Sequence, residues 1–174
     1  MRGTVRSLLM LLALLAGPAQ ATFHTYQIEE IFSNADGTVQ FVVLHEVAGA
    51  NGQNFFTGHT LTSSSGGAVN SYTFPNDLGG GMESGYGMFG GQTAFTRVLI
   101  ATQGFAALGI VKPDYVIPNG FIPLSNGTVN YAQVDQVTYT SLPTDGVTAI
   151  TRTGANLSNL ATNYAGSSGS VAPA

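Results

Sequence analysis

The chain has 174 residues, no cysteine and few charged residues, and its formal net charge is −4 at pH 7. The absence of cysteine excludes disulfides, thiol nucleophiles and cysteine-ligated zinc. The shortage of lysine and arginine excludes the basic patches that bind nucleic acid or anionic lipid.

The N-terminal segment 1–21 has the three parts of a secretory signal peptide, in order. Two arginines precede the unbroken apolar run Leu8 to Ala16, and the small residues of Ala19-Gln20-Ala21 end the segment. We expect cleavage after Ala21, which would make Thr22 the first residue of a secreted or periplasmic protein. The apolar run is shorter than the roughly 20 residues of a membrane-spanning helix. We therefore expect no membrane insertion after cleavage.

Beyond this segment, short apolar runs rich in β-branched and aromatic residues are separated by Gly, Asn, Asp and Pro, which is typical of a β-sandwich or barrel. The first two runs flank the turn Asn34 to Gly37 and predict a hairpin. The second run is apolar on both faces at Phe41 to Leu44, as expected of a central strand. We predict strands at 26–32, 38–47, 60–63, 70–74, 97–102, 115–117, 128–131, 136–139 and 148–152, and one helical turn at 105–108.

Two segments differ from this pattern. The segment 79–92 is rich in glycine and is predicted to be a long loop. Its Met and aromatic side chains could hold a partner or fold back onto the sheet. The segment 166–174 is small and polar, and we expect it to be a flexible tail. The domain organisation is then a signal peptide, one β-sandwich domain at 22–165 and the tail.

Several segments match a known family in order and spacing. They are Ile28 to Ile31, Gln40 to Leu44, Gly58 to Thr62, Tyr72 to Pro75 followed by Arg97 to Ala101, and Val137 to Tyr139 running into Leu142 to Gly146. Together they resemble the lamin-tail domain, an immunoglobulin-like β-sandwich found in many secreted bacterial proteins. The resemblance covers most of 26–164 and implies an interaction module. Val43 replaces the family's strand Glu and His59 its core Trp, and no binding residue of the family can be carried over.

No pattern in the sequence predicts a preorganised catalytic site, and we expect the protein not to be an enzyme. Ser84 lies in the glycine-rich segment, without the flanking glycines of a nucleophile elbow. Glu29 and Glu30 are adjacent in a strand, so we expect them on opposite faces, where they could not share a substrate. The same alternation separates His45 from Glu46.

We assign no residue to a catalytic, cofactor or metal site, and two metal alternatives stay open. Thr22-Phe23-His24 matches the amino-terminal copper(II) pattern, in which the α-amine, two amides and an imidazole supply four nitrogens. His59 is better explained by packing. Loop carboxylates could also bind calcium, although turn formation is the commoner explanation of such residues. These carboxylates are Asp36, Asp77, Asp114, Asp135 and Asp145.

The preferred interpretation is a secreted, non-enzymatic β-sandwich that binds a surface protein or a glycan through its sheet edges or its glycine-rich loop. A self-assembling matrix subunit is the second hypothesis, because uncharged strands rich in Thr, Ser and Asn favour edge pairing between copies. A small metal-dependent hydrolase is the third. No nucleic-acid partner is expected.

Overall fold

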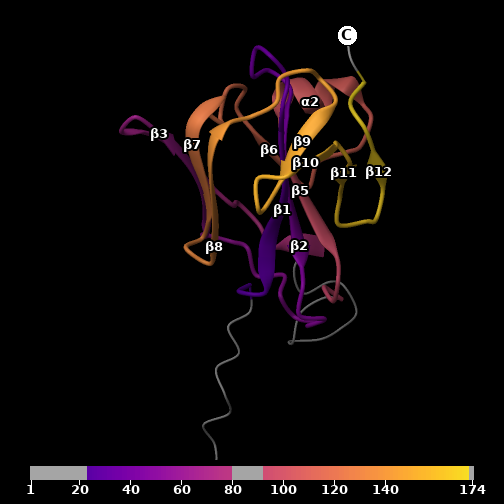
Figure 1. The fold of residues 1–174 in the computed structure, drawn as a ribbon. Helices are drawn as coiled ribbons and strands as arrows, with labels where there is room; N and C mark the ends of the chain where they lie inside the picture. The colour runs from indigo at the N-terminus through magenta and orange to yellow at the C-terminus, as the bar shows by residue number, and fades with distance from the viewer. Residues whose placement is uncertain (1–22, 80–91, 173–174) are drawn as a thin grey trace, which may run out of the picture.

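The computed structural model describes residues 23–79 and 92–172. The expected signal peptide, most of the predicted glycine-rich loop and the last two residues lie outside these ranges. Within them, the chain forms a six-stranded sheet in the order β10-β9-β1-β2-β5-β6, a four-stranded sheet in the order β4-β3-β7-β8 and a ribbon of β11 and β12 (Figure 1). The strands are β1 (Tyr26–Ser33), β2 (Gln40–Glu46), β3 (Thr60–Ser65), β4 (Ala68–Thr73), β5 (Arg97–Thr102), β6 (Tyr115–Ile117), β7 (Ser125–Tyr131), β8 (Asp135–Ser141), β9 (Thr148–Thr151), β10 (Asn156–Ser158), β11 (Ala161–Thr162) and β12 (Ser168–Gly169), and the helix is α2 (Gln103–Leu108).

The two larger sheets pack face to face, which confirms the predicted all-β sandwich. Their inner faces share one core, to which Ile28, Leu44 and Val129 contribute. Aromatic rings from loops and strands pack together in this core, where Phe56 lies edge-on to Tyr26 at 5.4 Å between ring centroids. Such pairs contribute about 1 kcal/mol each beyond the area that they bury.

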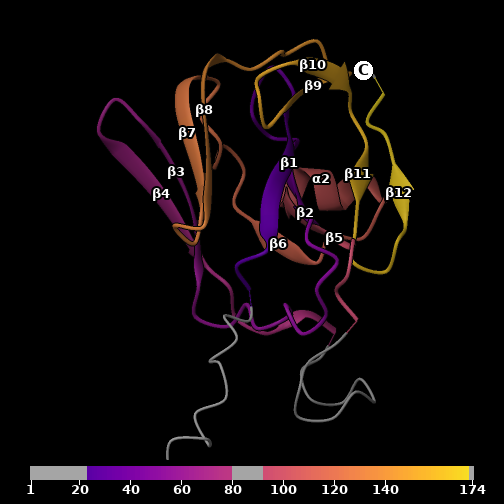
Figure 2. The same ribbon diagram turned by 60° about the horizontal axis from the view of Figure 1, so that its bottom comes forward.

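The outer face of the six-stranded sheet is also buried. Phe41 and Val43 of β2 pack there against Phe105 of α2 and Val171 near the C-terminus. Figure 2 shows the resulting three layers, with α2 and the β11–β12 ribbon on the side of the sheet opposite β7 and β8. This second cover explains why Phe41 to Leu44 is apolar at every position, as the sequence predicts for a central strand.

The predicted local signals around the first hairpin and the helix are confirmed. The β1–β2 hairpin closes through Asn34 to Gly37, with Gly37 at a φ of +73°. The helix α2 begins after Thr102, whose hydroxyl accepts the backbone N–H of Phe105, and it ends at Gly109 with a φ of +66°. A hydroxyl cap and a left-handed glycine satisfy the backbone groups that a short helix leaves unpaired.

The C-terminal segment differs from its prediction as a flexible tail. Residues Ser168–Gly169 form β12 against β11, and Val171 is buried with 8% of its surface exposed. One cause is Asn159, whose side chain accepts the N–H of Val171 at 2.7 Å and donates to its carbonyl at 3.0 Å. A second buried amide, that of Asn163, accepts the backbone N–H of Ser167 at 2.9 Å. Buried amides therefore order a segment whose own residues carry almost no structural signal.

Candidate functional site

A β-bulge in β1 brings together two carboxylates that the sequence pattern separates. The pairing of β1 with β2 shifts register between Ile28 and Glu30, so β1 has one extra residue there. After the shift Ile31, instead of Glu30, joins Ile28 in the inner core. The expectation that Glu29 and Glu30 face opposite sides is therefore wrong. Both line one hollow on the outer face, because a bulge inverts the alternation of a strand.

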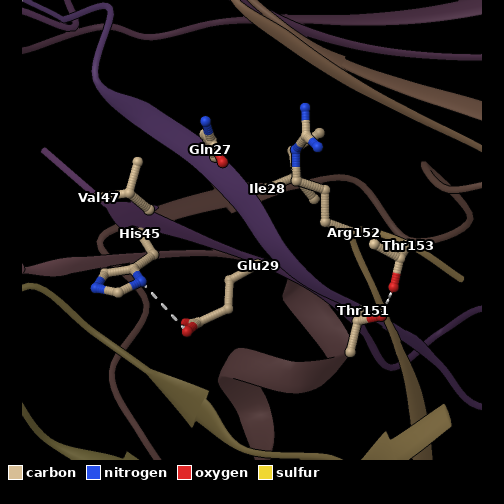
Figure 3. A pocket seen from close by; sticks show the side chains of 8 residues that line it. All are labelled: Gln27, Ile28, Glu29, His45, Val47, Thr151, Arg152 and Thr153. Carbon is tan, nitrogen blue, oxygen red and sulfur yellow. Dashed lines mark hydrogen bonds and ion pairs between the residues drawn. The ribbon is translucent and has the colours of Figure 1, made fainter. Parts of the chain in front are cut away.

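Glu29 contacts side chains of β2 and of β5, the next strand beyond β2. Arg97 of β5 donates to both of its carboxylate oxygens, at 2.5 and 2.7 Å. His45 of β2 places its Nδ1 at 3.4 Å from the same carboxylate (Figure 3). The bidentate pair raises the pKa of Arg97 further above its usual range. Since about a third of each side chain is exposed, this pair contributes at most about 1 kcal/mol to stability.

Glu30 is in a different environment although it is the next residue. Only 3% of its surface is exposed, and its Oε1 accepts the backbone N–H of Leu160 at 2.9 Å. Burial raises the pKa of Glu30 to about 7, and the neighbouring charge of Glu29 adds to the rise. The Leu160 bond and Arg97 act in the opposite direction. Glu30 therefore changes charge near neutral pH.

The two glutamates lie in a groove made of two adjoining hollows that share Glu29 and Thr151, and we call it the Glu29 groove. The first hollow, of about 260 Å³, is drawn in Figure 3. The second, of about 560 Å³, lies under the β10–β12 segment. The lining residues are Gln27, Ile28, His45, Val47, Arg152 and Thr153 in the first, and Glu30, Arg97, Leu157, Ser158, Leu160, Thr162 and Ser168 in the second.

The chemistry of the Glu29 groove favours hydrogen bonding over catalysis. An acid–base pair needs one free carboxylate beside one protonated carboxyl. Glu30 has a pKa near neutral, as a general acid requires. Both carboxylate oxygens of Glu29 accept hydrogen bonds from Arg97, so Glu29 is not free to act as the base. The pair is thus arranged to fix β1 to β5 and to the C-terminal segment.

Arg152, which lines the first hollow of the groove, forms an ion pair with Asp135. Arg152 donates to both carboxylate oxygens of Asp135, the shortest contact being 2.6 Å. The same carboxylate accepts the backbone N–H of Ile28 at 2.8 Å, next to the bulge. Asp135 therefore links β8 of one sheet to β1 and to the end of β9 in the other.

Glu46 is a structural carboxylate that sequence reasoning missed. It is fully buried and accepts the backbone N–H groups of Ala48, Ala50 and Phe95. Burial tends to raise its pKa, but these bonds outweigh burial and lower the pKa below the usual value. It orders the loop after β2 together with the residues that precede β5. A charged residue at the end of an apolar strand was the available signal.

Local contacts account for the positions of the three histidines. His45 is partly buried, and its Nδ1 lies 3.4 Å from the carboxylate of Glu29. His59 stacks on Phe23 at 3.5 Å between ring centroids, and Phe23 in turn lies 4.0 Å from the ring of His24. Burial, together with His24, lowers the pKa of His59. Packing thus explains His59, whereas Thr22 of the copper pattern is outside the described residues.

The carboxylate oxygens of the loop aspartates accept hydrogen bonds from groups of the protein itself. Asp36 and Asp145 each accept a nearby backbone N–H and a threonine hydroxyl, which is the turn-forming role. Asp77 instead accepts the backbone N–H and the hydroxyl of Thr57, which lies 20 residues earlier in the chain. Asp114 accepts two backbone N–H groups, from Leu99 and Tyr164. Within 23–79 and 92–172, no three acidic or histidine side chains are placed to hold a metal ion.

The second candidate surface is the open edge of β4. Five of its six residues are exposed, and Val69 has 64% of its surface exposed. The β3–β4 hairpin projects from the body of the sandwich (Figure 2), and within the described residues β4 pairs with β3 alone. The stretch Thr60 to Thr73 contains no proline and no charged residue.

The other sheet edges are protected in ways that β4 is not. β6 and β10 are three residues long. β8 is tied to the other sheet at its first residue, Asp135, which accepts the backbone N–H of Ile28 in β1. Short edge strands are one of the usual means by which proteins prevent edge pairing. β4 is therefore the edge best suited to accept another strand.

Comparisons of the chain with protein-family models, with curated proteins and with solved structures found no match. The lamin-tail resemblance therefore stays a prediction, while the sandwich itself is observed. Across the part of the chain that the structure describes, no helix has the length and apolar character needed to cross a membrane. The predicted contact residues Met82, Tyr86, Met88 and Phe89, and Ser84 with them, lie outside that part.

Proposed function

We propose that this chain is a secreted, non-enzymatic interaction module that binds an extended polypeptide by adding it as a strand to β4. The observation that carries the proposal is the exposed, uncharged edge of this six-residue strand. Strand addition uses backbone hydrogen bonds for affinity and alternate side chains for specificity. A polypeptide is favoured over a glycan because an open ladder offers alternating N–H and C=O groups at the spacing of another backbone.

The Glu29 groove supports the non-enzymatic part of the proposal. Arg97 and the backbone of Leu160 engage the two carboxylates that could otherwise perform acid–base chemistry. The signal-peptide pattern of 1–21 supports secretion, and the lamin-tail resemblance supports an immunoglobulin-like interaction domain. All three arguments are consistent with a protein that holds partners and performs no reaction.

The test is selection of a random heptapeptide phage library on the mature chain. We expect enriched clones that bind the wild-type chain and lose at least about tenfold in affinity to Ser71→Lys, because a lysine on an edge strand hinders pairing. Thr140→Lys is the matched control, since it adds the same charge to an exposed position of β8. Enriched clones that bind all three chains equally would overturn the proposal.

A further inference from the structure

The backbone of β4 has a defined set of groups directed to its open side. The hairpin turns through Gly66 and Gly67, both with positive φ, so that Ser65 and Ala68 form its closing pair. Hydrogen-bonded and non-hydrogen-bonded pairs alternate along an antiparallel ladder. At the other end of the hairpin the ladder extends one pair beyond the strands, because the N–H of Phe74, just after β4, donates to the carbonyl of His59, just before β3, at 2.9 Å.

These two ends fix the phase of the ladder. Phe74 and Ala68 bond toward β3, and with them every second residue between, namely Asn70 and Tyr72. The N–H and C=O groups of Val69, Ser71 and Thr73 therefore point to the open edge. Three such residues at alternate positions are enough for a ladder of several backbone hydrogen bonds.

We propose that the strand added to β4 is the β4 of a second copy of this chain, antiparallel, with Ser71 opposite Ser71 on a two-fold axis. This inference rests on the proposed function, since it names the partner at the same edge. Two identical antiparallel edges are related by an axis perpendicular to the sheet, which keeps each residue on its own face. Two residues that lie directly opposite each other across the axis must therefore have their side chains on the same face of the joined sheet.

The register with Ser71 on the axis uses every outward group. It places Val69 opposite Thr73 of the partner copy and Thr73 opposite Val69, so all three outward residues form hydrogen-bonded pairs. A register centred on Asn70 instead pairs Val69 with Ser71 and moves Thr73 opposite the glycine turn. Gly67 has a φ of +89° and is not in strand conformation, so that register makes fewer ladder bonds.

The side chains fit this arrangement on both faces of the joined sheet. Asn70 and Tyr72 face the body, because the amide of Asn70 donates to the carbonyl of Phe121 and Tyr72 packs beside the inner core. The side chains of Val69, Ser71 and Thr73 then lie on the other face. There the two Ser71 residues form the central pair, and a pair of Val69 with Thr73 lies on each side of it. Such pairs stabilise a sheet, and no like charges meet.

Cross-linking tests the register directly, because the chain has no cysteine of its own. Under mild oxidation, Ser71→Cys is expected to form a covalent dimer, since paired Cα atoms about 5.5 Å apart are within disulfide reach. Val69→Cys alone and Thr73→Cys alone should cross-link slowly, while their mixture should form the heterodimer. Thr140→Cys on β8 is the control for random collision.

Two outcomes overturn the proposed pairing. One is self-cross-linking of Val69→Cys or Thr140→Cys as fast as that of Ser71→Cys, which would place another register or another edge at the contact. The other is a wild-type chain that sediments as a monomer at about 1 mM, the weak end of protein association. Peptide binding at β4 without dimers would contradict the second copy and leave strand addition standing. Loss of both would remove strand addition as well.

Discussion

At the residue scale, the position of a single extra residue decides the character of the outer face. Without the bulge between Ile28 and Glu30, the carboxylate of Glu30 would point into the inner core, and Ile31 would point outward. With it, Glu30 is buried beside Glu29 and bonds the backbone of Leu160. Burial of a carboxyl without a cation on it disfavours the charged form, which is why the pKa of Glu30 rises to about 7.

This rise predicts how stability depends on pH. The folded chain holds the Glu30 proton more tightly than the unfolded chain, whose Glu pKa is near 4.5. The stabilising contribution is therefore complete below pH 4.5 and is lost as the pH rises through about 7. Glu30→Gln keeps an oxygen for Leu160 and has no charge, so between these limits the wild type should lose up to about 3 kcal/mol relative to the variant.

Urea unfolding of both chains at about pH 4.5 and about pH 8 measures this difference. The comparison cancels the carboxylates whose pKa values are lowered, namely Asp36, Glu46 and Asp145, and also Asp114, whose pKa is raised. Equal changes of unfolding free energy in the wild type and Glu30→Gln would contradict the assignment of a near-neutral pKa.

At the scale of elements, the C-terminal ribbon is the least expected part of the fold. β11 and β12 have two residues each, and no alternation of apolar residues marks them. They are held because Asn159 bonds both the carbonyl of Val147 and the backbone of Val171. Ala161 and Val171 then complete the cover over Phe41 and Phe105.

Asn159→Ala should therefore free the ribbon before the rest of the fold. The variant leaves the buried N–H of Val171 without its acceptor, and such a loss costs about 1–3 kcal/mol. We expect faster amide hydrogen exchange at residues 161–171, with little change in β2 and β5. Asn156→Ala, at an exposed position of β10, is the control. Unchanged protection of the ribbon would show that Asn159 does not hold it.

At the scale of the whole molecule, charge is scarce and mostly acidic. Beyond the expected cleavage point, the basic residues are Arg97, Lys112 and Arg152, against nine acidic residues in the chain. Both arginines are engaged with carboxylates. Two copies therefore repel each other weakly at long range, while the proposed contact at β4 contains no ion pair.

Salt should consequently not weaken the proposed dimer, in contrast to an interface built on ion pairs. Raising sodium chloride from about 0.05 M to about 0.5 M shortens the range of the repulsion between the two acidic bodies. We expect the dissociation constant measured by analytical ultracentrifugation to stay equal or to fall by a few-fold. A clear rise with salt would point to a contact between opposite charges and away from β4.

The sequence by itself determined the sandwich, nine of the strands and the helical turn, because their signals are local. Alternation, β-branched runs and turn residues act within a few positions, as in the hairpin at Asn34 to Gly37. The doubly apolar run Phe41 to Leu44 likewise predicted a strand that is buried on both faces. The two short strands predicted at 60–63 and 70–74 correspond to β3 and β4.

Only the tertiary structure decided the bulge in β1, the order of the C-terminal ribbon and the identity of the open edge. A bulge depends on how two strands pair, so adjacent glutamates carry no sign that they will share a face. The ribbon depends on buried amides, one of which reaches backbone twelve residues away in each direction. Whether a strand is at an edge depends on which strands find each other across the chain, and that is set by packing of the whole core.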